Sequence, residues 1–175
     1  HVAGASALLA EYFIATRGFY SPLYVKAVLA YSADPMKYSK PSNTVGFGYV
    51  NLASAWILKD TAVSFLVNRS TPLLLKASFG KGQRVLMLLF WQRVCEQYTD
   101  INVKIFNART GELVYKSPNT RDNFELVDVT VKKSATYLIE IVNDNGVGDQ
   151  VPVVIFTSLV LRRASIPKIT ILPYM

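Results

Sequence analysis

The sequence predicts an α + β protein in two parts: helices in residues 1–60, followed by an antiparallel β-sandwich, or jelly roll, in residues 61–175. Two observations lead to this prediction. Ala- and Leu-rich stretches with helix start and stop signals fill the first part, whereas β-branched and aromatic residues with closely spaced turn signals dominate from Thr61 onward. Lys59 and Asp60 mark the change, so we place the boundary near residue 60.

The first expected helix, residues 2–16, is rich in Ala and Leu and is apolar around nearly its whole circumference. This pattern is typical of a buried helix, because a surface helix carries polar residues on one face. Arg17 and Gly18 end the helix, since glycine readily adopts the left-handed conformation of a C-terminal cap. We therefore expect the helix to be covered on all sides.

Two shorter helices follow it. Ser21 and Pro22 begin the second, with serine as the N-cap and proline in the first turn, and the helix runs to about Ser32. A glycine-rich stretch, residues 46–51, leads into a third helix over residues 52–58.

The second part contains eight or nine short strand patterns without intervening helices, which favours a sandwich or jelly roll. The turn at residues 108–111 predicts a hairpin, because its glycine supplies a positive φ. The expected strands are 62–67, 73–79, 84–91, 101–107, 113–116, 125–131, 135–142, 151–161 and 168–172.

A chain of 175 residues with 51% apolar residues can bury a core. Only 18% of the residues are charged and the mean hydropathy is +0.24, so we expect much of the surface to pack on something, within the chain or outside it. The longest apolar stretches, 85–91 and 151–161, fall short of the roughly 18 to 20 residues that span a bilayer, which predicts no transmembrane segment. The start at His1, without a signal-peptide pattern, predicts a cut or truncated chain.

The net charge of +7 favours acidic partners, but the basic residues are scattered, with adjacent pairs only at 132–133 and 162–163. Residues 46–50 (Gly-Phe-Gly-Tyr-Val) resemble the aromatic strand of an RNA-recognition motif. However, Val45 stands where that motif has a basic residue, and Leu52 where it has an aromatic one. A glycine-rich turn entering a helix accounts for the same residues, so we expect no nucleic-acid partner.

Two single residues restrict the chemistry of the chain: His1 is the only histidine and Cys95 the only cysteine. They exclude an internal disulfide, most histidine metal sites, and any Ser-His-Asp arrangement other than one built on the terminal residue. Cys95 reads as a small packed side chain, and no pattern in the sequence supports a catalytic dyad of Cys95 with His1.

Asp100 and Asn102 are the candidate calcium ligands. They flank Ile101 at the start of an expected strand, so their oxygen-bearing side chains lie on one face. A capped strand entry has the same pattern, which leaves both interpretations open.

Residues 143–149 (Asn-Asp-Asn-Gly-Val-Gly-Asp) have the composition of a calcium loop. Aligning Gly146 with the EF-hand glycine, however, puts Ile141 at the first ligand position and Pro152 at the last, so a tight turn between strands is favoured. Residues 68–70 (Asn-Arg-Ser) form a sequon that would be glycosylated only in a secreted protein.

Several blocks resemble one known family. Residues 1–9 (His-Val-Ala-Gly-Ala-Ser-Ala-Leu-Leu) resemble the tail of the Gly-Thr-Ser-x-Ala-x-Pro-His-Val-Ala-Gly signature of subtilisin-like (subtilase) serine proteases, in which the nucleophilic serine opens a long buried helix. Residues 21–29 resemble the next helix of that family, and 46–55 resemble the Gly-x-Gly-x-Val-Asn stretch before its last helix. Four further blocks resemble the jelly-roll domain that follows the catalytic domain in some secreted subtilases: 85–91, 100–103, 123–127 and 135–141.

The resemblance implies that residues 1–60 are the helical C-terminal end of a subtilisin-like α/β domain and that 61–175 are a following jelly roll. The parent would be an extracellular or cell-surface serine endopeptidase, with its nucleophile about five residues before His1. His1 would be the histidine of the signature and not the general base, so the chain holds no catalytic residue. Asn102 stands where the family often has a second aspartate, and calcium is the one cofactor implied.

The implied partners are the missing N-terminal part of the catalytic domain and, through the parent, a polypeptide substrate. The chain would be non-catalytic on its own and would contribute scaffold and a β-domain that stabilises the enzyme or positions its substrate. The alternative is a non-catalytic surface binding or structural module.

Overall fold

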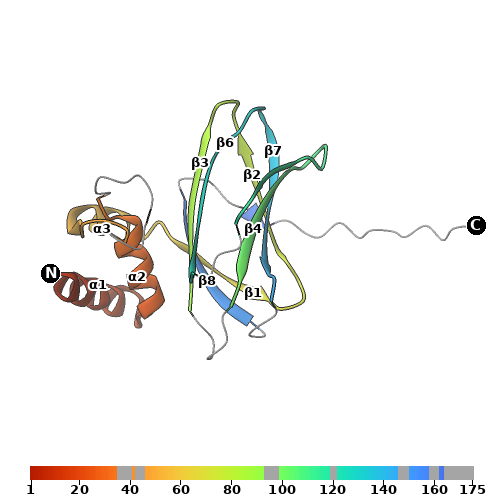
Figure 1. Ribbon diagram of the computed structural model, residues 1–175. Helices are drawn as coiled ribbons and strands as arrows, with labels where there is room; N and C mark the ends of the chain where they lie inside the picture. The colour runs from red at the N-terminus through yellow and green to blue at the C-terminus, as the bar shows by residue number, and fades with distance from the viewer. Residues whose placement is uncertain are drawn as a thin grey trace, which may run out of the picture.

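The computed structural model describes residues 1–34, 41, 46–92, 99–118, 122–145, 150–157 and 162–163. Three helices precede two antiparallel sheets (Figure 1), so the chain is an α + β protein with its helices first, as predicted. The helices are α1 (Val2–Arg17), α2 (Pro22–Tyr31) and α3 (Leu52–Leu58).

The helix ends follow the signals in the sequence. Gly18 terminates α1 with a φ of 76°, and its N–H donates to the carbonyl of Ile14. Ser21 is the extended N-cap of α2, but its side chain makes no capping hydrogen bond. At α3 the cap is Asn51, whose side chain accepts a hydrogen bond from the N–H of Ser54 over 2.9 Å.

The strands form a four-stranded sheet, in the order β1-β8-β3-β6, and a five-stranded sheet, in the order β5-β4-β7-β2-β9. From β1 to β8 the chain passes between the sheets at every connection except β4 to β5, which pair through the predicted hairpin. The strands are β1 (Val63–Asn68), β2 (Leu73–Phe79), β3 (Arg84–Trp91), β4 (Ile101–Asn107), β5 (Leu113–Lys116), β6 (Phe124–Thr130), β7 (Ala135–Asn143), β8 (Gln150–Thr157) and β9 (Arg162–Arg163).

Seven expected strands agree with the structure to within about a residue at each end. The expected strand 151–161 appears as β8, which ends at Thr157, and residues 158–161 lie outside the described residues. The expected strand 168–172 also lies outside them.

The two sheets face each other across a core that takes alternate residues from the strands of both, which is the arrangement of a β-sandwich. Trp91 and Tyr137 are its largest members, and the indole N–H of Trp91 donates to the carbonyl of Thr99 over 3.0 Å. The polar atoms of these large rings are therefore satisfied within the core.

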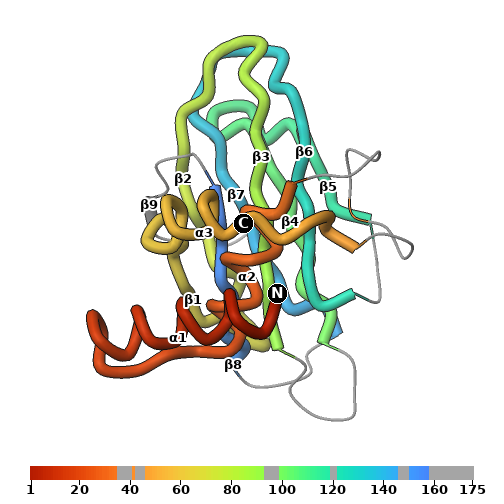
Figure 2. Tube along the Cα trace, turned by 90° about the vertical axis from the view of Figure 1, so that its left-hand side faces the viewer, coloured from red at the N-terminus to blue at the C-terminus, as the bar shows by residue number. Residues whose placement is uncertain are grey.

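A second apolar cluster joins the helices to the outer face of the four-stranded sheet (Figure 2). Leu88 and Phe90 of β3, with Val154 and Phe156 of β8, contribute the side chains of the sheet. Both faces of β3 and β8 are therefore covered, which explains why these strands are continuous apolar runs instead of alternating ones.

Helix α1 differs from the expectation of a helix covered on all sides. Only Ala5, Leu9 and Phe13, one turn apart along one face, are buried. Leu8 and Ile14, which lie outside this face, are about half exposed. In the described part of the chain α1 packs on α2 and, through Tyr12, on Trp56 of α3, so one face is buried. None of the helices in the described part of the chain is long and apolar enough to cross a membrane.

Candidate functional site

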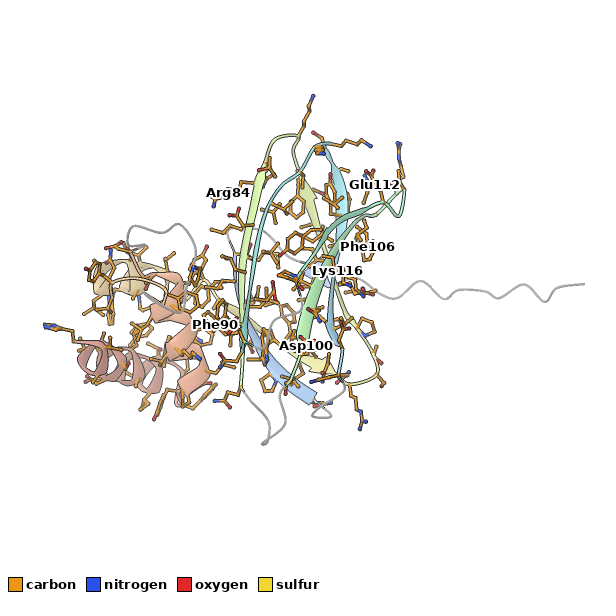
Figure 3. The ribbon with its side chains drawn as sticks, viewed as in Figure 1. Arg84, Phe90, Asp100, Phe106, Glu112 and Lys116 are labelled. Atoms are coloured by element: carbon orange, nitrogen blue, oxygen red, sulfur yellow. The ribbon has the colours of Figure 1, made fainter. Side chains whose placement is uncertain are left out.

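The two candidate calcium ligands meet at the start of β4, at the end of the sandwich opposite Glu112 (Figure 3). Asn102 is completely buried, and its Nδ2 donates to Oδ2 of Asp144 over 2.8 Å. Its Oδ1 accepts a hydrogen bond from Oγ of Ser117 over 3.1 Å. The Ser117 oxygen itself accepts a hydrogen bond from the N–H of Val103. Asn102 thus joins β4 to the turn after β7 and to the end of β5.

The backbone of Asp100 holds the same turn in place. Its carbonyl accepts from the N–H of Asp144 over 2.9 Å, and its N–H donates to Oδ1 of Asn145 over 3.2 Å. Burial raises the pKa of the Asp100 carboxyl, the amide of Asn102 opposes this effect, and the negative charge of Asp144 adds to it. A cation at this position would relieve that repulsion.

Hydrogen bonds therefore connect the loop 143–149 to Asp100 and Asn102. The sequence patterns had indicated two separate features. Residues 143–145 form the end of β7 and a turn, as expected, and residues 146–149 lie outside the described residues. Asp144 is the residue that the loop contributes to the cluster.

The donor set suits calcium in kind but is incomplete. Carboxylate and amide oxygens are hard ligands of the type that calcium takes, and the buried Thr99 hydroxyl before Asp100 has no hydrogen-bond partner among the residues that the structure describes. Among the described residues, however, no three His, Cys, Asp or Glu side chains are grouped so that they could hold a metal ion. A calcium ion there would need backbone oxygens and water besides Asp100, Asn102 and Asp144.

Glu125, which sequence reasoning did not select, is the most perturbed carboxyl of the cluster. It lies on β6 opposite Leu89 of β3 and is only 4% exposed. Burial, with the charges of Asp100 and Asp122, raises its pKa to about 7. Within the described residues it has no hydrogen bond or ion pair. The signal in the sequence was its position, because Glu125 takes an inward-facing place in the alternation of an apolar strand.

Glu125 lines an open pocket of about 400 Å³ at the edge of the sandwich, beside Tyr115 and Asp128. Burial and the charges of Glu125 and Asp128 raise the pKa of Tyr115 to about 12. The Tyr115 hydroxyl donates to the carbonyl of Leu126 over 3.3 Å, which bridges the edges of the two sheets. The carboxylate of Asp128 accepts two hydrogen bonds from the guanidinium of Arg84 in a bidentate pair.

The other predicted positions lie apart from this cluster. His1 is the exposed N-cap residue of α1, and Cys95, with the dyad it was considered for, lies outside the described residues. The sequon at 68–70 is exposed at the end of β1.

The glycine-rich stretch forms a turn, as expected, with positive φ angles at Gly46 and Gly48. The ring of Phe47 packs against Phe124 at 4.8 Å and Phe90 at 5.5 Å between centroids. This ring anchors the helical part on the sheet, whereas stacking on RNA bases needs an exposed ring.

Most of the large apolar side chains that are exposed in the described residues lie in the helical part. They include Val2, Leu8 and Ile14 on α1 and Trp56 and Ile57 on α3.

No model of a known protein family matches the chain, and no curated protein matches it.

Proposed function

We propose that the chain is the C-terminal part of a subtilisin-like serine endopeptidase. Residues 1–60 complete its catalytic domain, and residues 61–175 are a jelly-roll domain that stabilises the enzyme or positions its substrate. The chain supplies scaffold, and the nucleophile, general base and triad aspartate belong to the upstream part. The parent acts outside the cell or at its surface.

The observation that carries this proposal is that α1 is apolar beyond the face it buries. One face packs in the second cluster through Leu9 and Phe13, while Leu8 and Ile14 face solvent. A helix that is apolar around most of its circumference suits a position between two layers, such as beneath the parallel sheet of a subtilase. The signature-like residues 1–4 open this same helix.

The strand order supports the second half of the proposal. The orders β1-β8-β3-β6 and β5-β4-β7-β2, with crossings between two facing sheets, fit a jelly roll of eight strands. The cluster shared by α2, β3 and β8 gives this domain a direct route for stabilising the helices. Calcium at Asp100, Asn102 and Asp144 would reinforce the end of the sandwich at which β4 begins.

Complementation tests the proposal. The purified chain alone should cleave no peptide and react with no serine-directed phosphonate, and adding the N-terminal portion of the parent should restore both activities. Labelling of the isolated chain would contradict the assignment. If the complemented protein is also inert and unrelated residues precede His1, the chain is instead a non-catalytic module.

A matched pair of variants makes the test specific for the α1 face. Leu8 of α1 is 48% exposed and Leu113 of β5 is 51% exposed, so aspartate at either position disturbs the fold of the isolated chain equally little. Leu8→Asp should prevent restoration of labelling, because the charge would be buried beneath the added sheet. Leu113→Asp should leave restoration unchanged. Equal behaviour of both variants would argue against docking through α1.

A further inference from the structure

The pocket at the β6 edge combines acidic and apolar walls. Glu125 and Asp122 bring negative charge, and Tyr115, Phe124, Pro118 and Leu126 bring apolar and aromatic surface. Its volume of about 400 Å³ is sufficient for a long side chain. The pocket opens to solvent at the edge strands of both sheets, so a ligand can reach it without any change in the strands.

Glu125 is the feature that distinguishes this pocket from an ordinary acidic surface. Its side chain is more than nine-tenths buried, lines the pocket, and has no hydrogen bond or ion pair among the described residues. The nearest charges that act on it, Asp100 and Asp122, are also negative. Among the described residues, the charges that act on this buried carboxyl have the same sign as its own, which is costly, and a positive group would convert this cost into a favourable interaction.

The form of the site favours an organic cation over a metal ion. The acidic side chains are not grouped closely enough to hold a metal ion within the described residues. The aromatic and aliphatic walls add nothing to metal coordination, but they suit the stem of a lysine or arginine side chain. The ring of Tyr115 can also contact a planar guanidinium.

We propose that this pocket binds a basic side chain of a polypeptide, with the carboxylate of Glu125 pairing with the cationic head and the walls of Tyr115 and Pro118 covering its stem. This site is independent of the proposed protease assignment, because the residues described as lining it, Pro41 among them, all belong to this chain.

The test titrates the 175-residue chain with a short blocked peptide, acetyl-Gly-Arg-Gly-amide, and follows backbone amide shifts by NMR. The matched probe replaces arginine with citrulline, which keeps the shape and removes the charge. We expect saturable shifts along β5 and β6 with the arginine peptide only, and weaker binding as salt is added. Equal binding of the citrulline peptide, or no binding of either, overturns the proposal.

Variants then assign the site. Glu125→Gln should weaken binding roughly tenfold or more, because it removes the charge of a buried pair while keeping the shape. Glu112→Gln, at the other end of the sandwich, should leave binding unchanged. Thermal melting verifies that both variants fold. Binding that survives Glu125→Gln in a folded protein, or Glu125-dependent binding of Ca²⁺ without binding of the arginine peptide, overturns the proposal.

Discussion

The guanidinium of Arg17 donates a hydrogen bond to Oδ1 of Asp60 over 2.8 Å, which ties the last turn of α1 to the segment after α3. The same guanidinium lies over the rings of Phe13 and Tyr24, at 4.8 and 4.9 Å from their centroids. Burial of the Asp60 carboxyl raises its pKa, but hydrogen bonds from Tyr12 and Arg17 outweigh burial and hold the pKa below its usual value. The ion pair between Arg17 and Asp60 therefore holds the end of α1 beside the point where the chain enters the sandwich.

Replacing Arg17 tests how much its ion pair and ring contacts contribute to stability. We expect Arg17→Met to lower the free energy of unfolding by about 1 kcal/mol, because an exposed ion pair and a cation–π contact each contribute little. Urea denaturation measures the change. Arg17→Lys should recover only part of it, since lysine cannot present a planar fork. Full recovery by lysine would show that charge alone matters at this position.

The second apolar cluster predicts that the helices and the sandwich unfold together. Phe156 of β8 is completely buried, and its ring stacks on Tyr31 of α2 at 4.9 Å. Phe156→Ala should cost about 3 to 5 kcal/mol and separate the two parts. Calorimetry of the unchanged chain should show one transition, and the variant should show an early loss of helical signal. Two separate transitions in the unchanged chain would contradict a shared core.

The position of Glu125 predicts an unusual pH dependence. The folded protein keeps the Glu125 proton up to about pH 7, whereas the unfolded chain loses it near the ordinary value of 4.5. The free energy of unfolding therefore falls as pH rises through this window, by on the order of 3 kcal/mol. Glu125→Gln should lack this fall and be the more stable protein at pH 8 in metal-free buffer. A parallel pH profile for the two proteins would refute the predicted ionisation.

Calcium binding is tested by thermal melting with and without chelator. If Asp100 contributes to a calcium site, added Ca²⁺ should raise the melting temperature of the unchanged chain, because binding to the folded state alone stabilises it. Asp100→Asn should abolish that rise. Glu112→Gln is the control, since Glu112 is a similarly charged residue at the opposite end of the sandwich. A rise that persists in Asp100→Asn would place the ion elsewhere.

Local patterns in the sequence predicted the elements well but not the cluster. Gly18 and Pro22 mark helix ends through their own backbone preferences, and the strand patterns reflect alternating burial, so both can be recognised locally. The joining of Asn102 to Asp144, 42 residues apart, depends on the pairing of β4 with β7. Composition and spacing do not encode such a pairing. Glu125 was missed for a similar reason, since its environment comes from other strands.

Helix α1 is a second place where the structure differs from the sequence-based prediction, because it buries a single apolar face. The composition of residues 2–16 predicted cover on all sides, and local pattern reports how apolar a helix is without saying which chain covers it. The exposed Leu8 and Ile14 are where the proposed upstream domain would pack.

The most direct test of the central claim is phosphonate labelling of the full gene product, followed by mass spectrometry of the labelled peptide. We predict a label on one serine about five residues before His1, within Gly-Thr-Ser-x-Ala-x-Pro, and no label within residues 1–175. A label on a residue of this chain, or an active full-length protein that takes no label, would contradict it.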